Sequence, residues 1–229
     1  FLNNGAHASG GTAGIVTGGN NVAIGYASLL TLTDGGHNVA IGNQAGQSAT
    51  GADYNILIGY QSGLNISTGE HNIIMGWRAG DAITTMNNII AIGYNAGSAI
   101  NSADANQTTL IGFNTGASIT EAQATTAVGS YALDALTTGD YNTAFGYSAG
   151  SAMTTGSENT FIGYQSASSG VVTGGENVAL GTTALQALTS GGTNTALGVR
   201  AGLVLTEGDS NVFVGKDAGD SATVINESV

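Results

Sequence analysis

Six carboxylates are the first side chains in this sequence with chemistry suited to binding. They share a place just ahead of short apolar runs: Asp53, Glu70, Asp140, Glu158, Glu176 and Asp209. Carboxylate oxygens at turns are the ligands that Ca²⁺ prefers. Their spacing does not follow the G-G-x-G-x-D pattern of coils that bind calcium. We therefore interpret them as a solvated acidic edge that opposes edge-to-edge aggregation, and we expect no metal and no cofactor.

Seven aromatic residues form a second set with binding chemistry. Each follows a recurring glycine: Tyr26, Tyr60, Trp77, Tyr94, Phe113, Tyr147 and Tyr164. A column of exposed rings could bind glycans. Rings that repeat at one position more often pack on each other, within a rod or between chains. The sequence thus predicts an aromatic ladder, and glycan binding is the alternative.

Nine threonines recur at a fixed distance after the same glycine. They are Thr33, Thr50, Thr84, Thr120, Thr137, Thr154, Thr189, Thr206 and Thr223. A row of threonine hydroxyls could order water or bind ice. The residues beside them are mixed and form no second threonine row, so we interpret the threonines as β-branched residues that precede glycine turns.

The sequence contains no constellation that we would assign to catalysis. The three histidines, His7, His37 and His71, lie far apart in the chain, and there is no cysteine. We find no convincing Ser/His/Asp set, carboxylate pair or H-E-x-x-H segment. We expect that this chain is not an enzyme.

A fixed period positions all of these side chains. Its central glycine, called position 0 below, recurs at Gly25, Gly42, Gly59, Gly76, Gly93, Gly112, Gly129, Gly146, Gly163, Gly181, Gly198 and Gly215. Nine of the eleven intervals are 17 residues, and the other two are 19 and 18. Self-similarity of this kind indicates a repeat architecture and decides the class of fold.

Each repeat has a short apolar run between an asparagine and the glycine. The asparagine at position −4 occurs in nine repeats: Asn21, Asn38, Asn55, Asn72, Asn142, Asn159, Asn177, Asn194 and Asn211. Positions −3 to −1 are mostly apolar or β-branched, which predicts a strand covered on both faces. The asparagines are expected either to adopt a left-handed conformation or to stack as a ladder.

The second half of each repeat carries small residues at +3, mostly glycine at +4, and a larger apolar residue at +7. Seventeen residues are too few for a repeat that contains helices. The pattern predicts an all-β fold: a parallel β-roll or β-solenoid of about twelve 17-residue coils, with equivalent positions stacked ~4.8 Å apart. The position-0 glycines are expected to supply a positive φ or a close approach between coils.

We divide the chain into a degenerate first coil at 1–20, a β-roll repeat domain at 21–219 and the tail of the repeat region at 220–229. The longest interval holds a loop insertion near 101–107. Position −4 is Ile89, Thr108 or Thr125 around this insertion, so we expect a local irregularity across 86–126. Because the chain begins at Phe1 rather than Met, we expect it to be a segment of a longer or processed polypeptide.

Composition argues against several classes of partner. The net charge is −12, and the only cationic side chains besides histidine are Arg78, Arg200 and Lys216. This balance opposes binding to nucleic acid and docking on anionic membranes. No apolar run approaches the ~20 residues of a membrane-spanning helix. With 8% charged and 41% hydrophobic residues, the chain lacks the composition of a disordered segment.

The segments 38–46 (NVAIGNQAG) and 72–80 (NIIMGWRAG) resemble two related repeats. One is the head repeat of YadA-like trimeric autotransporter adhesins. The other is the NTAIGYQAG…TTG repeat of bacteriophage tail fibres and similar surface fibres. The resemblance covers about 21–219, and the 17-residue period with its aromatic and Thr-Thr-Gly elements favours the phage type.

This resemblance implies a parallel homotrimer, with its chains intertwined or side by side, located outside the cell on a virion or cell surface. The expected function is that of a structural shaft in a fibre that gives reach and host attachment. The expected partners are copies of the chain itself and a glycan or protein receptor on the host. The alternatives are a trimeric adhesin head that binds matrix or glycans and an ice-binding β-solenoid.

Overall fold

The computed structural model describes residues 18–221 and 223–226. Its regular elements are twelve three-residue strands and one 3₁₀ helix: β1 (Val22–Ile24), β2 (Val39–Ile41), β3 (Ile56–Ile58), β4 (Ile73–Met75), β5 (Ile90–Ile92), η1 (Ala103–Ala105), β6 (Thr109–Ile111), β7 (Thr126–Val128), β8 (Thr143–Phe145), β9 (Thr160–Ile162), β10 (Val178–Leu180), β11 (Thr195–Leu197) and β12 (Val212–Val214). Most of the expected degenerate coil at 1–20 and part of the tail at 220–229 lie outside the described residues.

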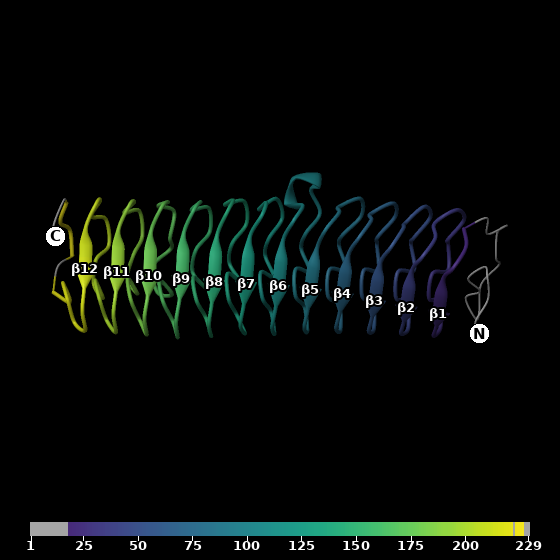
Figure 1. The fold of residues 1–229 in the computed structure, drawn as a ribbon, viewed down its shortest axis with the longest axis horizontal. Helices are drawn as coiled ribbons and strands as arrows, with labels where there is room; N and C mark the ends of the chain where they lie inside the picture. Colours follow the sequence, from purple (N-terminus) through teal and green to yellow (C-terminus); the bar gives the residue numbers. More distant parts are fainter. Residues whose placement is uncertain (1–17, 222, 227–229) are drawn as a thin grey trace.

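Every strand pairs in parallel with the next strand in the chain, so the sheet order runs from β1 to β12 without a crossover (Figure 1). The register joins equivalent positions of successive repeats: Val22 lies beside Val39, and Ala23 lies beside Ala40. The same register continues across the longest interval, where Ile90 pairs with Thr109. The prediction of an all-β, parallel β-solenoid with a period of 17 residues is confirmed.

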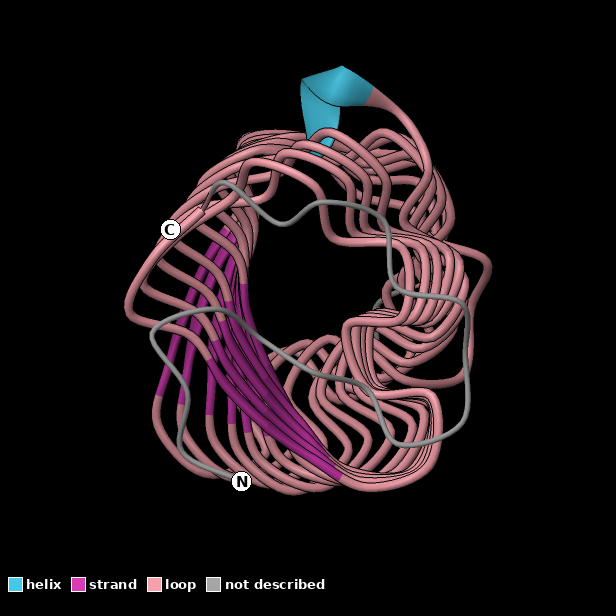
Figure 2. Cartoon of the chain, turned by 90° about the vertical axis from the view of Figure 1, so that its right-hand side faces the viewer, coloured by secondary structure: helices cyan, strands magenta, loops and turns pink. Residues whose placement is uncertain are grey.

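Backbone hydrogen bonds between coils extend well beyond the strands. Gly42 N–H donates to the carbonyl of Ile24 at 2.8 Å, and Gly46 N–H donates to the carbonyl of Ser62 at 3.0 Å. Seen along the rod, the strands form one wall of the coil and turns form the remainder (Figure 2). Coil-to-coil bonding therefore satisfies backbone groups on all sides of the rod, as buried polar groups require.

The interior of the coil is filled mainly by two columns of buried side chains. Position −2 of each strand points inward, as in Leu57 and Phe161, and position +7 meets it from the far side, as in Ile66 and Ile119. All four side chains are completely buried. Small residues at +3 and glycine at +4 leave room for them, since a Cβ on Gly46 would lie 2.5 Å from the Cδ1 of Leu57.

The outward face of the strands is only partly covered within one chain. Positions −3 and −1 are apolar or threonine in all twelve strands, yet none is fully buried within the chain, and many are exposed: Ile24 is 50% exposed, Phe145 56% and Val214 65%. Side chains alternate between the two faces of a strand, and this coil has an interior on only one of them. The apolar character of positions −3 and −1 thus has no explanation within a single chain.

Besides the mostly glycine column at +4, left-handed backbone conformations occur at two columns that sequence analysis missed. Position −5 and position +2 have positive φ in all twelve repeats, for example 60° at His37 and 52° at Arg78. The residues at these columns are chemically diverse, so no glycine or asparagine signature marks them. Stacking between coils outweighs the modest local cost of this conformation for non-glycine residues.

The loop insertion is a short outward excursion of one coil. The helix η1 rises from the rod between β5 and β6 (Figure 1). Ala105 stays buried, and the Oδ1 of Asn106 accepts a hydrogen bond from Asn87 N–H at 2.7 Å. The two extra residues are therefore absorbed locally, and the coils on both sides keep their register.

The position-0 glycines face two constraints at once. Their φ values lie between 120° and 144°, a region that side chains of L-residues rarely adopt. A Cβ at Gly146 would also lie 2.5 Å from the carbonyl oxygen of Gly163 in the next coil. At Gly192, by contrast, φ is not in the left-handed region, and the nearest atom to a Cβ would be the carbonyl oxygen of Gly175 at 3.3 Å.

The two glycines provide a matched comparison. We expect Gly146→Ala to lower the free energy of unfolding by at least ~3 kcal/mol, because it combines backbone strain with a backbone clash. Gly192→Ala should cost ~1 kcal/mol or less, because it has neither the strain nor a close backbone clash. Denaturant unfolding of both variants measures the difference, and equal losses would contradict the role assigned to the position-0 glycines.

Candidate functional site

The asparagines at position −4 form a buried hydrogen-bonded ladder along the rod. Asn177 shows the pattern: its Nδ2 donates to the Oδ1 of Asn159 at 3.0 Å and to the carbonyl of Gly191 at 2.9 Å. Its Oδ1 accepts from both the backbone N–H and the Nδ2 of Asn194, each at 3.0 Å. Both donors and both lone pairs of the amide are thereby used, and the ladder arrangement, not the left-handed one, is what the structure shows.

The ladder has two sections separated by a gap. The first runs through Asn21, Asn38, Asn55 and Asn72, and the second through Asn142, Asn159, Asn177, Asn194 and Asn211. In the gap, Ile89 N–H still donates to the Oδ1 of Asn72, and the hydroxyls of Thr108 and Thr125 bond backbone carbonyls instead. The gap falls within the irregular region predicted at 86–126.

The aromatic column is more continuous than the sequence indicated. Tyr60, Trp77, Tyr94 and Phe113 stack with ring centroids 4.8 to 5.8 Å apart, and Tyr147 stacks on Tyr164 at 5.5 Å. Tyr131, from position +2, fills the level where position +1 is Ser130, and it contacts Phe113 and Tyr147 edge-on. Tyr26 lies outside this run, with Asn43 between it and Tyr60.

Stacking limits what this column can bind. Rings at interplanar angles of 4° to 15° cover each other's faces, so their outward surface consists mainly of ring edges. Sugars bind aromatic side chains through the ring face, which carries the negative end of the quadrupole. The geometry therefore favours the packing interpretation of this column over glycan binding.

The acidic edge has a structural function that sequence analysis missed. The carboxylate of Asp140 accepts a hydrogen bond from Gln123 N–H at 2.8 Å, and that of Asp209 accepts one from Gly192 N–H at 2.7 Å. Asp53 does the same for Gly36. These position −6 side chains cap backbone amides of the preceding coil. Among the described residues, no group of three or more His, Asp or Glu side chains is arranged to hold a metal ion.

The threonine hydroxyls are likewise engaged within the rod. Thr137 donates to the carbonyl of Thr154, and Thr189 donates to the carbonyl of Thr206, both at 2.9 Å. A hydroxyl held by the neighbouring coil has lost its donor for ordering water. This arrangement weighs against an ice-binding face.

Two of the three histidines join a second, shorter stack. His37 and His71 lie on either side of Tyr54, with ring centroids 4.7 and 5.1 Å away, whereas His7 lies outside the described residues. All three stacked side chains belong to position −5. Each of these two histidines stacks on the Tyr54 ring, and the Nδ1 of His71 also lies 3.8 Å from the Oε2 of Glu70.

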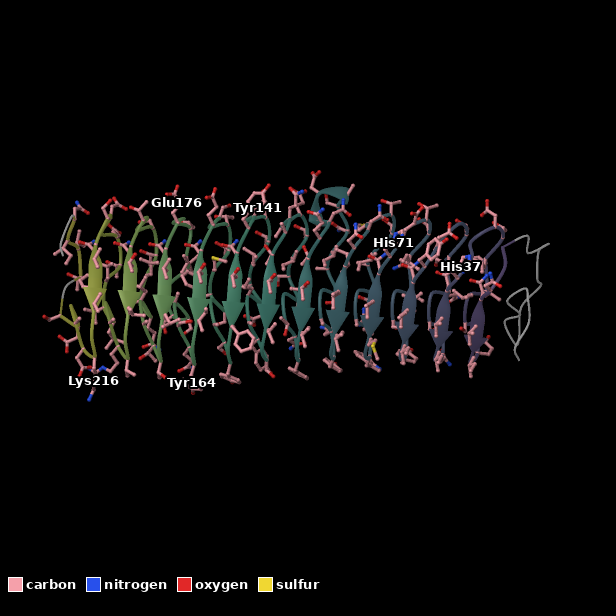
Figure 3. All side chains as sticks on the ribbon, in the orientation of Figure 1. His37, His71, Tyr141, Tyr164, Glu176 and Lys216 are labelled. Atoms are coloured by element: carbon pink, nitrogen blue, oxygen red, sulfur yellow. The ribbon has the colours of Figure 1, made fainter. Side chains whose placement is uncertain are left out.

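The two margins of the strand wall carry different charges. We call positions −6 and −5 the −5 margin, and positions +1 and +2 the +1 margin. Glu158 and Glu176 lie on the −5 margin with the capping carboxylates. Arg78, Arg200 and Lys216 lie on the +1 margin, together with one carboxylate, Asp217, that pairs with both Arg200 and Lys216. Figure 3 shows the margins on opposite sides of the strands, with His71 and Glu176 on one and Tyr164 and Lys216 on the other.

One carboxylate is poorly placed for its charge. Asp134, at position +5, has a buried Oδ1 without a hydrogen-bond partner. Burial raises the pKa of its carboxyl above the ordinary 3.8, although backbone hydrogen bonds from Asp134 and Ala135 act in the opposite direction. The equivalent Asp81 has a cation within reach, because the Nε of Arg78 lies 2.7 Å from its Oδ2. Position +2 of the coil of Asp134 is Tyr131, which supplies no such charge.

Comparison with known protein families, curated proteins and solved structures finds no match for this chain. Among the described residues, no helix is long and apolar enough to cross a membrane. Inferences about function therefore depend on the geometry of the coils and on the resemblance of their repeat.

The ladder predicts an unusual sensitivity to an isosteric change. Asn177→Asp removes both amide donors and places carboxylate oxygens against the Oδ1 of Asn159 and the carbonyl of Gly191. We expect a loss of ~3–5 kcal/mol of unfolding free energy at pH 7, the range for breaking a buried polar network. Thr125→Val, in the ladder gap, removes a single weak hydrogen bond of 3.3 Å and should cost ~1 kcal/mol. Similar costs in denaturant unfolding would refute the cooperative ladder.

Asp134 gives a prediction with a defined pH dependence. Because its folded pKa is raised, the folded chain binds the proton more tightly than the unfolded chain, and stability falls as the pH rises through and above 3.8. Asp134→Asn removes this loss. We expect the variant to melt at a higher temperature than the parent at pH 7, with the gap closing toward pH 3. A gap that is constant between pH 3 and 7 would contradict the assignment.

Proposed function

We propose that this chain is the structural shaft of an extracellular, parallel homotrimeric fibre, of the kind found in phage tail fibres and similar surface appendages. The observation that carries the proposal is the uniformity of the coil. Twelve strands repeat the same inward and outward columns in one register, and hydroxyls, amides, carboxylates and rings at most levels bond or stack with the neighbouring coil. Such an array supplies length, at a stability that is roughly a sum over coils and their interfaces.

The outward strand face supports assembly of several chains. Its 24 positions, two in each of twelve strands, contain no charged residue, in a chain with a net charge of −12. The outward positions of a sheet that faces water normally carry polar residues, and monomers rarely expose so long an apolar stripe. Packing against copies of the chain covers this face and explains the apolar residues at −3 and −1.

An adhesin head is the second candidate, and a specific feature favours it. The excursion around η1 departs outward from the common outline of the coils. Loops that project from a rigid scaffold commonly carry recognition. A head that binds along its coils would instead lose attachment in proportion to the number of coils removed.

Deleting residues 39–72 tests the shaft directly. This removes two whole coils and joins Asn38 to Ile73, a residue equivalent to Val39, so the register is kept. We expect a folded trimer, shorter by ~10 Å, with unchanged adsorption to host cells when carried on the fibre. Sedimentation establishes the trimer, and cell adsorption measures attachment.

The matched control shortens 101–107 to the length of the regular connection. Lost adsorption in this variant alone would place attachment at the loop and keep the shaft proposal for the rest of the chain. Lost adsorption after deletion of 39–72, in a fibre that is still trimeric, would favour recognition along the coils. A stable monomer of the parent chain at micromolar concentration would refute the assembly.

A further inference from the structure

We propose that neighbouring chains meet margin to margin, with the −5 margin of one chain against the +1 margin of the next. This inference rests on the proposed trimer and specifies its contact. The occupant of the exposed strand face is thus a second copy of this chain, in parallel and at the same level. The argument combines the position of the uncharged strip, its area, and the residues along its two margins.

The uncharged strip lies between the two margins. The asparagine at −4, the three-residue strand and the glycine at 0 separate position −5 from position +1. Between these margins the side chains at −2 are buried, whereas those at −3 and −1 lie on the outward face. In a cyclic trimer whose axis is parallel to the rods, the middle of each chain's strip faces the axis. This arrangement places the −5 margin of one chain against the +1 margin of its neighbour, because a cyclic assembly joins unlike edges.

The area of this strip suffices for a stable interface. Twelve levels at ~4.8 Å give a length of ~58 Å, and six residues of extended chain give a width of up to ~20 Å. The product is on the order of 1,100 Å² per chain, about half of it facing each of the two neighbours, so each pairwise contact buries on the order of 1,100 Å² in total from its two chains, just above the ~1,000 Å² expected of a biological interface. The strip is also depleted of charge, as the buried centre of an interface requires.

Aromatic residues at the two margins fall on the same levels. Three coils carry a ring at both −5 and +1: Tyr54 with Tyr60, His71 with Trp77, and Tyr141 with Tyr147. Within one chain the two rings of a pair are separated by the width of the strand. A rotation about the rod axis preserves height, so in the assembly the ring of one chain lies near the level of its counterpart in the next. Because the stacked rings present mainly their edges outward, such a pair buries the apolar edges of both rings at the contact.

Charges are matched in the same way. The coil with Arg78 on its +1 margin carries Glu70 on its −5 margin, and the coil with Lys216 carries Asp209. The coil with Arg200 has no acid at its −5 margin, where Gly192 and Thr193 stand. Two of the three cations thus meet a carboxylate of the neighbour at their own level, in addition to their partners within the chain.

Cysteine pairs test this contact cleanly, because the chain has no cysteine of its own. Ala124→Cys and Ser130→Cys place one thiol on each margin of the same coil at positions with small side chains. A short bismaleimide cannot join them within a chain across a distance on the order of 15–20 Å. We expect the double variant to give a covalent trimer as its main product on a denaturing gel, and each single variant to stay monomeric on the same gel.

A mismatched pair serves as the control. Ala124→Cys with Val199→Cys separates the thiols by four levels, ~19 Å along the rod, and should give no covalent trimer. Tyr141→Cys with Tyr147→Cys repeats the matched test at another level. Sedimentation and thermal melting of each variant establish that it is folded and assembled before crosslinking.

The outcomes distinguish the two proposals. A trimer by sedimentation that yields no covalent trimer from either matched pair overturns the margin contact and leaves the shaft intact. Covalent dimers from a single variant show that like margins meet, which also overturns it. A chain that sediments as a monomer overturns the assembly and the margin contact together.

Discussion

Stacking of equivalent positions at the strand spacing is the constraint on which the rest of this structure depends. Each coil has too small an interior to hold itself together, so its backbone groups bond to the coils above and below. A residue that suits one level must therefore suit its copy at the next level. This is why glycine is retained at position 0, where the carbonyl of the next coil occupies the space of a Cβ.

The same constraint explains why side chains with binding chemistry do so little binding in this rod. Amides of the asparagine column bond to each other, carboxylates such as Asp140 cap amides of the adjacent coil, and most rings of the aromatic column cover each other's faces. Ladders of this type hold identical groups in register and rely on each group having a partner on both sides. What remains free is mainly the outward strand face and the excursion at η1, and these two features carry the proposals on assembly and recognition.

The sequence by itself determined the class of fold, the period, the position of the strands and the place of the insertion. Those inferences succeed because each coil of a solenoid has the same physical requirements. The coils need inward-facing side chains at −2 and +7, most use the amide of asparagine at −4, and all need glycine at 0, so the same residue types recur at these positions. Where the residue type at position −4 changes, as at Ile89 and Thr108, the structure changes locally, and the asparagine ladder is interrupted.

Only the tertiary structure decided the features that depend on what lies one coil away. The positive φ at positions −5 and +2 is imposed by backbone bonds to the adjacent coil, and residues as different as His37 and Glu176 adopt it. Tyr131 completes the aromatic column from a different position than its neighbours. The structure also shows which strand positions lack cover within one chain: positions −3 and −1 face outward, because a coil with one interior can cover only one face of its strands.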